Sequence, residues 1–407
     1  MVFPRGIEGQ VRKVLWEYRK MAFISGPRQV GKTTFARGLQ KATGQGCYFN
    51  WDVLTDQKQL ARDPYFYEHK DREPKRPFLV VFDEIHKYRR WKNYLKGVFD
   101  RSADEFTFVV TGSGRLDLYR KGGDSLLGRY LGVPLYPLSV GELTGGGGTY
   151  RAFLQSLAEP LASTPQSRDA HVRLLELNGF PEPFARSARD FLAVWTAERK
   201  KLLVREDIRD ATTLRELSLI EMLTNLLPVR VGSPLSIASL REDLGVAFET
   251  VRDWLAVLHQ FYYSFPIPPY STSLTRALRK ASKVYLFDWA EVPEEPMRFE
   301  NLVALHLHKA VSIWNAGGEA AAGVHYLRDK EKHEVDFVLT DKGRPFCLVE
   351  CKLSDTTVHP PLAYYQNKLG APVAVQLVGK TGVCRKIKGD AGTVWVISAD
   401  RWLSALP

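Results

Sequence analysis

One eight-residue motif limits the fold of this chain more than any other feature of its sequence. Residues 26–33 read Gly-Pro-Arg-Gln-Val-Gly-Lys-Thr and match the pattern GxxxxGK[ST]. The apolar run at residues 21–25 predicts a buried strand before the motif, and a helix is predicted from Lys32. A glycine-rich turn between a strand and a helix presents backbone N–H groups and the positive end of the helix dipole to an anion. The motif therefore predicts a phosphate-binding loop in an α/β domain.

The residue types of the loop predict how a nucleoside triphosphate and Mg²⁺ are held. Backbone amides wrap the β-phosphate, Lys32 reaches the β- and γ-phosphate oxygens, and the Thr33 hydroxyl ligates Mg²⁺. The predicted nucleotide-binding residues are Gly26, Pro27, Arg28, Gln29, Val30, Gly31, Lys32, Thr33 and Thr34. ATP and Mg²⁺ are the expected cofactors.

A second apolar run ends in two carboxylates. Residues 79–84 read Leu-Val-Val-Phe-Asp-Glu, a pattern that delivers an acid from the tip of a buried strand to the metal. Asp83 is predicted to hold Mg²⁺ through a water, and Glu84 to polarise the attacking water as general base. The alternative is that both carboxylates only cap the helix that follows. The phosphate loop upstream favours the catalytic interpretation.

Two further residues are candidates for contact with the γ-phosphate. The apolar run 106–110 leads into Thr111-Gly112-Ser113, which places Ser113 where a hydroxyl senses that phosphate, although small polar residues end many strands for turn reasons. Arg129 precedes the last predicted strand of the domain, and an arginine that reaches the nucleotide of a neighbouring subunit would stabilise charge in the transition state. An ordinary surface arginine fits the same position. The predicted catalytic residues are Lys32, Glu84, Ser113 and Arg129.

Several segments together resemble a known family. They are GPRQVGKTT, LVVFDEIHK, FVVTGSGRL, LLGRYLGVPLYPLS, NGFPEPF at residues 178–184 and ENLVALHL at residues 300–307. In combination they are similar to a family of prokaryotic AAA-type ATPases that carry a C-terminal domain of unknown function, and the similarity covers nearly the whole chain. The resemblance implies an ATPase that forms a homo-oligomer, often a hexamer, and leaves its substrate open. One departure is the basic run at residues 87–92, which is either a polyanion contact or a solvated loop.

The C-terminal part carries a second set of carboxylates. Asp336 lies in a predicted strand, and Glu350-Cys351-Lys352 lies in the next strand, followed by a predicted helix. This arrangement resembles the PD-(D/E)XK fold of restriction-endonuclease-like nucleases. Glu350 and Lys352 are two residues apart in a strand and therefore share a face of the sheet. On that face Asp336 and Glu350 are predicted to share Mg²⁺, while Lys352 orients a water near the scissile phosphate. Glu300, on the preceding helix, is a further candidate ligand. The alternative is an inert or binding fold, because ExK also occurs by chance in strands.

Periodicity and composition divide the rest of the chain. Four consecutive glycines at residues 145–148 predict a flexible joint. Helical periodicity follows, and then two short predicted helices and an aromatic run fit a winged helix. We therefore predict an α/β fold class with four parts: a P-loop NTPase (AAA-type) core at 1–145, a helical lid at 149–230, a winged helix at 231–270 and a restriction-endonuclease-like domain at 283–407.

Charge and composition bear on partners and compartment. Lys and Arg outnumber Asp and Glu by 57 to 46, which favours a polyanionic partner such as DNA. The predicted contacts are Arg199, Lys200, Lys201, Arg276, Arg279, Lys280 and Lys283. The second helix of the predicted winged helix is a poorer candidate, because it should expose Glu249, Arg252, Asp253 and Ala256. Without a long uncharged apolar run or a signal segment, and with four cysteines that form no CxxC pair, the chain is expected to be cytoplasmic, without membrane contact, disulfide framework or structural zinc.

Together these features predict an ATPase that hydrolyses ATP to bind or remodel DNA, with branched or repair intermediates as candidate substrates. Two alternatives stay open. One is an ATP-controlled switch that binds proteins, and the other is a metal-dependent nuclease gated by ATP.

Overall fold

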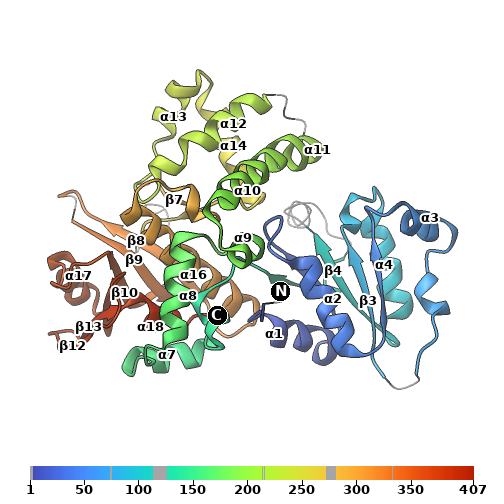
Figure 1. Ribbon diagram of the computed structural model, residues 1–407, viewed down its shortest axis with the longest axis horizontal. Helices are drawn as coiled ribbons and strands as arrows, with labels where there is room; N and C mark the ends of the chain where they lie inside the picture. The colour runs from blue at the N-terminus through green and yellow to red at the C-terminus, as the bar shows by residue number, and fades with distance from the viewer. Residues whose placement is uncertain are drawn as a thin grey trace. The chain divides into compact units, whose positions relative to one another are not determined.

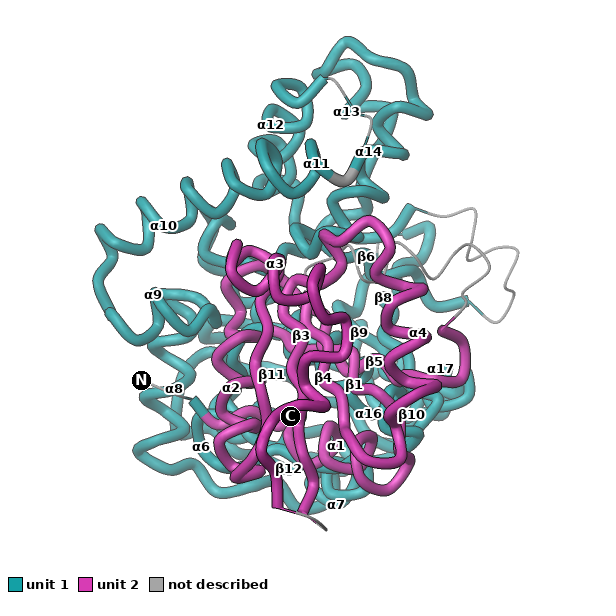
Figure 2. Tube along the Cα trace, turned by 90° about the vertical axis from the view of Figure 1, so that its right-hand side faces the viewer, with its two compact units in different colours: residues 1, 3, 137–407 teal, residues 2, 4–136 magenta. Residues whose placement is uncertain are grey.

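The chain forms two compact units. A computed structural model describes residues 3–73, 76–112, 126–212, 214, 216–271, 281–331 and 333–407. Residues 4–136 form the N-terminal unit and residues 137–407 the C-terminal unit, magenta and teal in Figure 2. None of the helices within these described ranges is both long and apolar enough to cross a membrane.

The N-terminal unit is built on a parallel five-stranded sheet in the order β2-β3-β4-β1-β5. Figure 1 labels β3 and β4 of this sheet. The strands are β1 (Met21–Ser25), β2 (Gly46–Asn50), β3 (Phe78–Asp83), β4 (Phe106–Gly112) and β5 (Tyr130–Pro134). The helices are α1 (Glu8–Arg12), which continues as the π-helical η1 (Lys13–Glu17), α2 (Lys32–Thr43), α3 (Leu54–Arg62) and α4 (Trp91–Ser102), with 3-10 turns η2 (Phe66–His69) and η3 (Ile85–Lys87). The strands predicted at 21–25, 78–82 and 106–110 are confirmed. β2 was missed, because its apolar run, Cys47-Tyr48-Phe49, is only three residues long.

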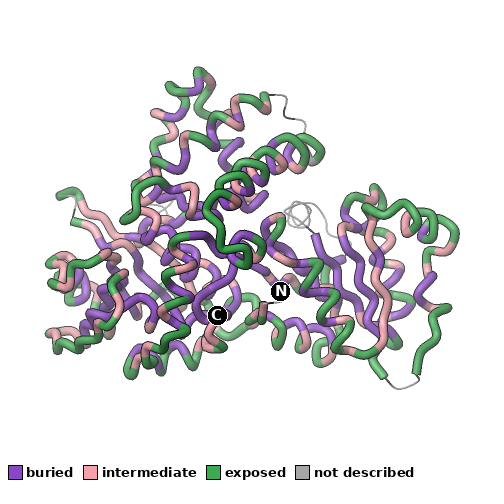
Figure 3. The backbone as a smooth tube through the Cα atoms, viewed as in Figure 1, coloured by how far each residue is buried: buried purple, intermediate pink, exposed green. Residues whose placement is uncertain are grey.

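Two inner strands of the sheet are buried from end to end. Every residue of β1 and β3 is buried, and Figure 3 shows purple strands in this unit with green along its helices. Strands covered on both faces carry continuous apolar runs, which is why periodicity found them. Because all five strands run in one direction, their carboxyl ends share one edge of the sheet. That edge receives the phosphate loop after β1, Asp83 at the end of β3 and Thr111 near the end of β4.

The first half of the C-terminal unit is helical, as its periodicity predicts. Its helices are α6 (Val140–Thr144), α7 (Tyr150–Ala158), α8 (Pro165–Glu176), α9 (Pro181–Arg186), α10 (Arg189–Leu202) with its π-helical extension η5 (Leu203–Ile208), α11 (Arg209–Ala211), α12 (Leu217–Leu226), η6 (Pro228–Arg230), α13 (Ile237–Leu244) and α14 (Phe248–Gln260). A two-stranded antiparallel sheet of β6 (Ser264–Ile267) and β7 (Lys283–Leu286) follows. On α14 the four residues expected to be exposed, Glu249, Arg252, Asp253 and Ala256, are exposed.

The second half contains a six-stranded mixed sheet in the order β12-β13-β11-β10-β9-β8. Its elements are η7 (Trp289–Glu291), α16 (Glu295–Ala316), β8 (Ala322–Arg328), β9 (Glu334–Asp341), β10 (Arg344–Lys352), α17 (Pro360–Leu369), β11 (Val373–Val378), β12 (Cys384–Lys388), β13 (Thr393–Ser398) and α18 (Ala399–Leu403). Lys342 and Gly343 both have positive φ, which gives β9 and β10 a two-residue hairpin turn. α17 then connects β10 to its parallel neighbour β11.

The four glycines at 145–148 do not form the predicted flexible joint. Gly146 and Gly147 lie against the backbone near the C-terminus: a Cβ on Gly147 would sit 2.3 Å from the Leu406 carbonyl oxygen, and one on Gly146 would sit 2.6 Å from that of Ser404. Glycine is needed here for close backbone approach, a reason that sequence alone does not distinguish from flexibility.

Helix α16 holds the segment that begins the C-terminal unit through buried polar contacts. The Val140 N–H donates to His306 Nε2 (3.1 Å), and His306 Nδ1 donates to the Leu302 carbonyl (2.8 Å). Lys309 Nζ lies 2.7 Å from Glu142 Oε2 and also donates to Ser139 Oγ (3.1 Å). Because all these groups are buried, each depends on its partner for stability.

The buried ring of His306 predicts acid sensitivity. Burial lowers the pKa of His306 to about 3, while an unfolded histidine titrates near 6.5. A depressed folded pKa means that the neutral ring contributes stability above pH 6.5, and that this stability is lost as pH falls toward 3. Between pH 7.5 and 5.0 the free energy of unfolding should fall by about 2 kcal/mol from this residue alone.

Urea unfolding of His306→Gln at the two pH values tests this expectation, because glutamine keeps an acceptor for Val140 and does not titrate. The variant should lose less stability on acidification than the wild type does. The matched control is His69→Gln, since His69 is exposed. Equal acid losses in His306→Gln and wild type would show that His306 does not carry the effect.

Candidate functional site

The phosphate loop has the backbone that the motif predicts. Gly26 follows β1 directly, and a Cβ at this position would lie 2.0 Å from the Leu135 carbonyl oxygen, so only glycine fits. Gln29 and Gly31 have positive φ (64° and 98°), which turns the chain back toward α2. Gly31 offers no side-chain cap to α2. The loop therefore leads into a helix start whose dipole favours an anion.

Lys32 points back into its own loop. Its side chain is buried, and Nζ donates to the carbonyl oxygens of Gly26 (2.9 Å) and Pro27 (2.7 Å). An ammonium group has three protons to donate. The contacts hold the positive charge inside the curve of the loop, where a bound phosphate would need it.

Asp83 gathers hydroxyl groups at the carboxyl edge of the sheet. Thr33 Oγ1 donates to Asp83 Oδ2 (2.7 Å), and the Tyr48 hydroxyl donates to the same oxygen (2.5 Å). Thr111 Oγ1 donates to Oδ1. The two predicted Mg²⁺ ligands, fifty residues apart, are therefore brought into direct contact.

Tyr48 was missed by the sequence analysis. It lies in β2, next to β3, and the guanidinium of Arg37 from α2 stacks 4.1 Å from its ring centroid. Burial, with the Asp83 carboxylate, raises the pKa of Tyr48, so its hydroxyl stays protonated and donates. The only signal in the sequence is the short hydrophobic stretch Cys47-Tyr48-Phe49, which is too short to reveal a strand by periodicity.

Glu84 lies beside Asp83 in a left-handed backbone conformation. Its φ is 55°, its N–H donates to the Thr111 carbonyl (3.1 Å), and its Oε2 lies 3.4 Å from Lys87 Nζ. Burial raises the pKa of the Glu84 carboxyl, and the charges of Lys32 and Lys87 oppose that shift. A carboxyl whose pKa is raised from its usual range is better suited to accept a proton from water. A left-handed φ at a non-glycine residue is often found at functional positions.

Of the other two predicted catalytic residues, Arg129 is not in this group, and Ser113 lies outside the described residues. Arg129 precedes β5 at the amino edge of the sheet, where its carbonyl accepts from the Met21 N–H (3.0 Å). Its guanidinium forms a bidentate pair with Asp100 of α4 (2.6 and 2.9 Å). Contact with the nucleotide of another subunit, which stays a prediction, would require this pair to open.

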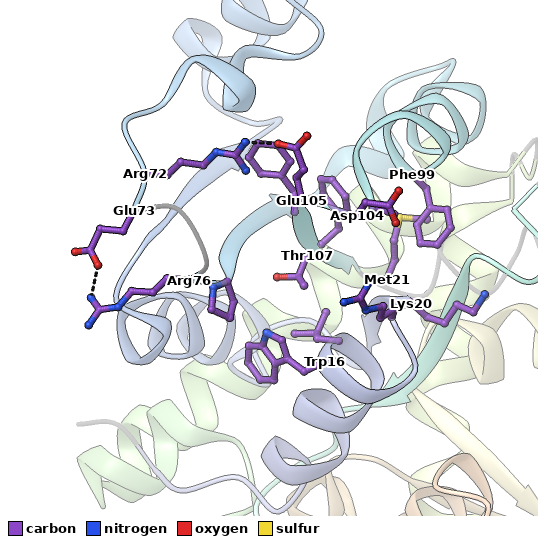
Figure 4. A pocket seen from close by; sticks show the side chains of 16 residues that line it. Trp16, Lys20, Met21, Arg72, Glu73, Arg76, Phe99, Asp104, Glu105 and Thr107 are labelled. Atoms are coloured by element: carbon purple, nitrogen blue, oxygen red, sulfur yellow. Dashed lines mark hydrogen bonds and ion pairs between the residues drawn. The ribbon is translucent and has the colours of Figure 1, made fainter.

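A cavity of the N-terminal unit also lies at the amino edge of its sheet. It has a volume of about 620 Å³ and is lined by side chains that include Trp16, Lys20, Met21 and Thr107 (Figure 4). Arg72 pairs with Glu105 on its rim. Because β1 separates this cavity from the phosphate loop by a strand length, about 16 Å, it is not part of the nucleotide site.

The predicted carboxylates of the C-terminal unit are neighbours, but each has its own partner. Asp336 Oδ2 accepts from the Cys351 N–H (2.8 Å), and Glu350 Oε1 lies 2.8 Å from Lys352 Nζ. Glu300 Oε1 accepts from the Tyr285 hydroxyl (2.6 Å) and lies 3.2 Å from Lys283 Nζ. Burial, reinforced by the Asp336 charge, raises the pKa of Glu300 to about 7 and that of Glu350 to about 8.

Two of the predicted polyanion contacts, Lys283 and Arg199, are wrong because their side chains are buried inside the C-terminal unit. Lys283 is fully buried. Arg199 is also buried, stacks on Phe180, and lies 3.6 Å from Glu291 Oε1. Lys200 donates to Asn225 Oδ1 (2.8 Å). Lys201 is exposed, and Arg276, Arg279 and Lys280 lie outside the described residues.

Some residues of the basic run at 87–92 make contacts within the N-terminal unit, and others are exposed to solvent. Lys87 forms an ion pair with Asp52 (2.6 Å), and Trp91 is a core residue of the N-terminal unit. Arg89 and Arg90 are exposed. The run therefore anchors the start of α4 and leaves two arginines at the surface.

Comparison with protein families identifies the class of the N-terminal part. Residues 18–144 match a family model described as an AAA domain. Residues 169–290 match a domain of unknown function (DUF8612), and residues 297–397 match another (DUF4143). The chain thus carries an AAA-type ATPase domain followed by two domains of unknown function, which confirms the AAA-type part of the resemblance.

Individual relatives are distant. The chain is 22% identical over 334 residues to the uncharacterized protein Rv2008c of Mycobacterium tuberculosis and, equally, to the uncharacterized protein Mb2031c of Mycobacterium bovis; each alignment covers 80% of this chain and 69% of the relative. Among solved structures it is similar to the ORC1 protein of Aeropyrum pernix in complex with DNA (16% identity, 74% of this chain, 93% of that chain, TM-score 0.32). It is also similar to Hsp104 of S. cerevisiae in complex with casein (14% identity, 64% of this chain, 50% of that chain, TM-score 0.29).

Proposed function

We propose that this chain is a Mg²⁺-dependent ATPase whose nucleotide site lies at the carboxyl edge of the N-terminal sheet. The contact between Thr33 and Asp83 carries the proposal, because it brings a hydroxyl of the phosphate loop and the acid at the end of β3 to one point. A hydroxyl and a carboxylate are the hard oxygen ligands that Mg²⁺ prefers. The match of residues 18–144 to an AAA domain supports the same function.

Each residue of the site has a separate role in hydrolysis. The loop amides and the α2 dipole bind phosphate, and Lys32 exchanges its contacts with Gly26 and Pro27 for phosphate oxygens. Thr33 and Asp83 hold the metal, which when bound neutralises phosphate charge. Glu84 takes a proton from the attacking water. Tyr48 and Thr111 orient Asp83 by donating to its two oxygens.

Phosphate release by the purified chain tests this function. Turnover should require Mg²⁺, and Lys32→Ala should lower it by at least about a hundredfold, the effect of removing one charge-stabilising group from such a site. The matched control is Lys41→Ala at the other end of α2, which should leave turnover unchanged. Equal rates in wild type and Lys32→Ala would show that the loop does not serve hydrolysis.

The proposal extends to DNA as the partner on which ATP hydrolysis acts. The positive charge is concentrated in the N-terminal unit: residues 4–136 contain 25 Lys and Arg against 15 Asp and Glu, whereas residues 137–407 contain 32 against 31. In that unit Lys58, Arg62, His69 and Lys70 line one groove of about 500 Å³ between α3 and η2. Asp63 is the one acid in the groove lining. Such a basic surface favours a phosphate backbone.

Charge reversal in the groove separates DNA contact from catalysis. ATP turnover by the wild type at low salt should rise with added duplex, single-stranded or junction DNA. Lys58→Glu and Arg62→Glu should weaken that response and reduce the salt slope of DNA binding by about 1 each, with basal turnover unchanged. The control is Arg252→Glu, whose side chain on α14 already pairs with Glu249 and Asp253.

The same measurements decide between DNA and a protein partner. The near-neutral exposed face of α14 favours an ATP-controlled protein-binding switch as the second candidate. Turnover that does not respond to any of the three DNAs would exclude DNA remodelling and leave the switch.

A further inference from the structure

An ammonium group occupies the centre of the C-terminal carboxylates. Lys283 begins β7, and its side chain is fully buried. Its Nζ lies 2.5 Å from Glu334 Oε1, 3.2 Å from Glu300 Oε1 and 3.8 Å from Asp336 Oδ1. Three carboxylates from α16 and β9 therefore surround one lysine, and an ammonium group has three protons to offer them.

These residues do not fit a divalent cation in this arrangement. Mg²⁺ needs oxygen ligands about 2.0–2.1 Å away that converge on one point. Within the described ranges, the one group of three or more ligand atoms within 4.8 Å of one another is Asp329, Glu331 and His333, and it contains none of the predicted ligands. Glu300 and Asp336 face the Lys283 ammonium, whereas Glu350 faces Lys352 and His359.

The negative charges of the cluster are offset in part by protein cations. Its four acids are Glu300, Glu334, Asp336 and Glu350, and three cations face them. Lys283 faces the first three acids, Lys352 faces Glu350, and Arg328 Nε lies 3.5 Å from Glu334 Oε2. Such partners stabilise buried carboxylates. Each carboxylate of the cluster therefore already has a protein cation beside it.

We infer that Lys283 takes the place of the metal ion in the C-terminal unit. The cluster fastens β7 to α16 and β9, and the unit does not cleave phosphodiester bonds through a metal at Glu300, Asp336 and Glu350. This conclusion does not depend on the ATPase function. It predicts that removal of the ammonium group converts the cluster into a divalent-cation site.

Mn²⁺ binding to the nucleotide-free full chain tests the inference. The parent chain, which keeps Lys283, and the Lys283→Met variant both carry Asp83→Asn, so that the ATP site contributes no bound metal. Lys283→Met should bind one Mn²⁺ more per chain than its Lys283 parent, because Glu300 and Asp336 lose their ammonium partner and Glu334 keeps only Arg328. The matched control is Lys309→Met, which removes another buried lysine of the same unit that faces one carboxylate, and it should gain none.

A second measurement uses the natural lysine and does not require Lys283→Met to fold. In EDTA, Asp336→Asn should lower the Tm by about 2–4 °C or more, because it removes a partner of Lys283. If the cluster were an empty metal site, Asp336→Asn would raise the Tm, because one carboxylate fewer relieves the repulsion among the remaining carboxylates. A raised Tm, or Mn²⁺ binding by the parent that Asp336→Asn abolishes, would overturn the inference, as would a folded Lys283→Met that gains no Mn²⁺.

Discussion

Replacing Glu84 with glutamine is expected to slow ATP hydrolysis about 10²–10⁴-fold, the usual contribution of a general base. Glutamine keeps the size of the side chain and can still accept a hydrogen bond from Lys87, but it cannot take a proton from water. ATP affinity should therefore stay close to that of the wild type. Single-turnover phosphate release measures the chemical step, and a titration with ATP measures binding separately.

The control for this substitution lies in the same unit. Glu105→Gln changes an exposed carboxylate at the amino edge of the sheet, paired there with Arg72, and should leave both quantities unchanged. If Glu84→Gln hydrolysed ATP within tenfold of the wild-type rate, Glu84 would not be the base. The alternative, in which Asp83 and Glu84 only cap the helix that follows, would then be favoured.

Replacing Lys309 with methionine is expected to lower the free energy of unfolding by about 3–5 kcal/mol. The Glu142 carboxylate is buried, and Lys309 Nζ is the ammonium group 2.7 Å from it. Without that cation the carboxylate must either stay charged in an apolar interior or take up a proton, and both cost free energy. Urea unfolding at neutral pH measures the loss.

The double variant shows whether the loss comes from the ion pair. Adding Glu142→Gln to Lys309→Met removes the uncompensated charge, so the double variant should be more stable than Lys309→Met alone. The control is Arg252→Met, because its ion pairs with Glu249 and Asp253 are exposed and worth little. If the double variant lost as much as the sum of the two single variants, the pair would contribute no coupling.

The nucleotide site could be predicted because its determinants are local. Glycines at fixed spacing, a lysine and a threonine at a helix start, and an acid after an apolar run are each readable within a few residues. The parallel sheet then brings them together, since strands that run in one direction share their carboxyl edge. Tyr48 was not predicted, because a tyrosine in a short strand has no pattern that points to Asp83.

The C-terminal carboxylates show the opposite case. Glu350 and Lys352 lie on β10, next to Asp336 on β9, as the sequence predicts. Spacing along the chain, however, gives no information about a lysine that belongs to a third strand. The sequence predicts that Lys283 is a surface contact with a polyanion. Its burial depends on how β7 lies against α16 and β9, which no local pattern encodes.

By itself, the sequence of this chain determined the phosphate loop, the acids that accompany it and the buried strands that carry them, because these depend on neighbours in sequence and on the direction of strands. Only the tertiary structure decided which charges are neutralised inside the protein. Arg199, Lys200 and Lys283 read as free cations in the sequence, and each is paired in the fold, because a charge that leaves water is stable only beside a partner, and that partner can lie anywhere along the chain.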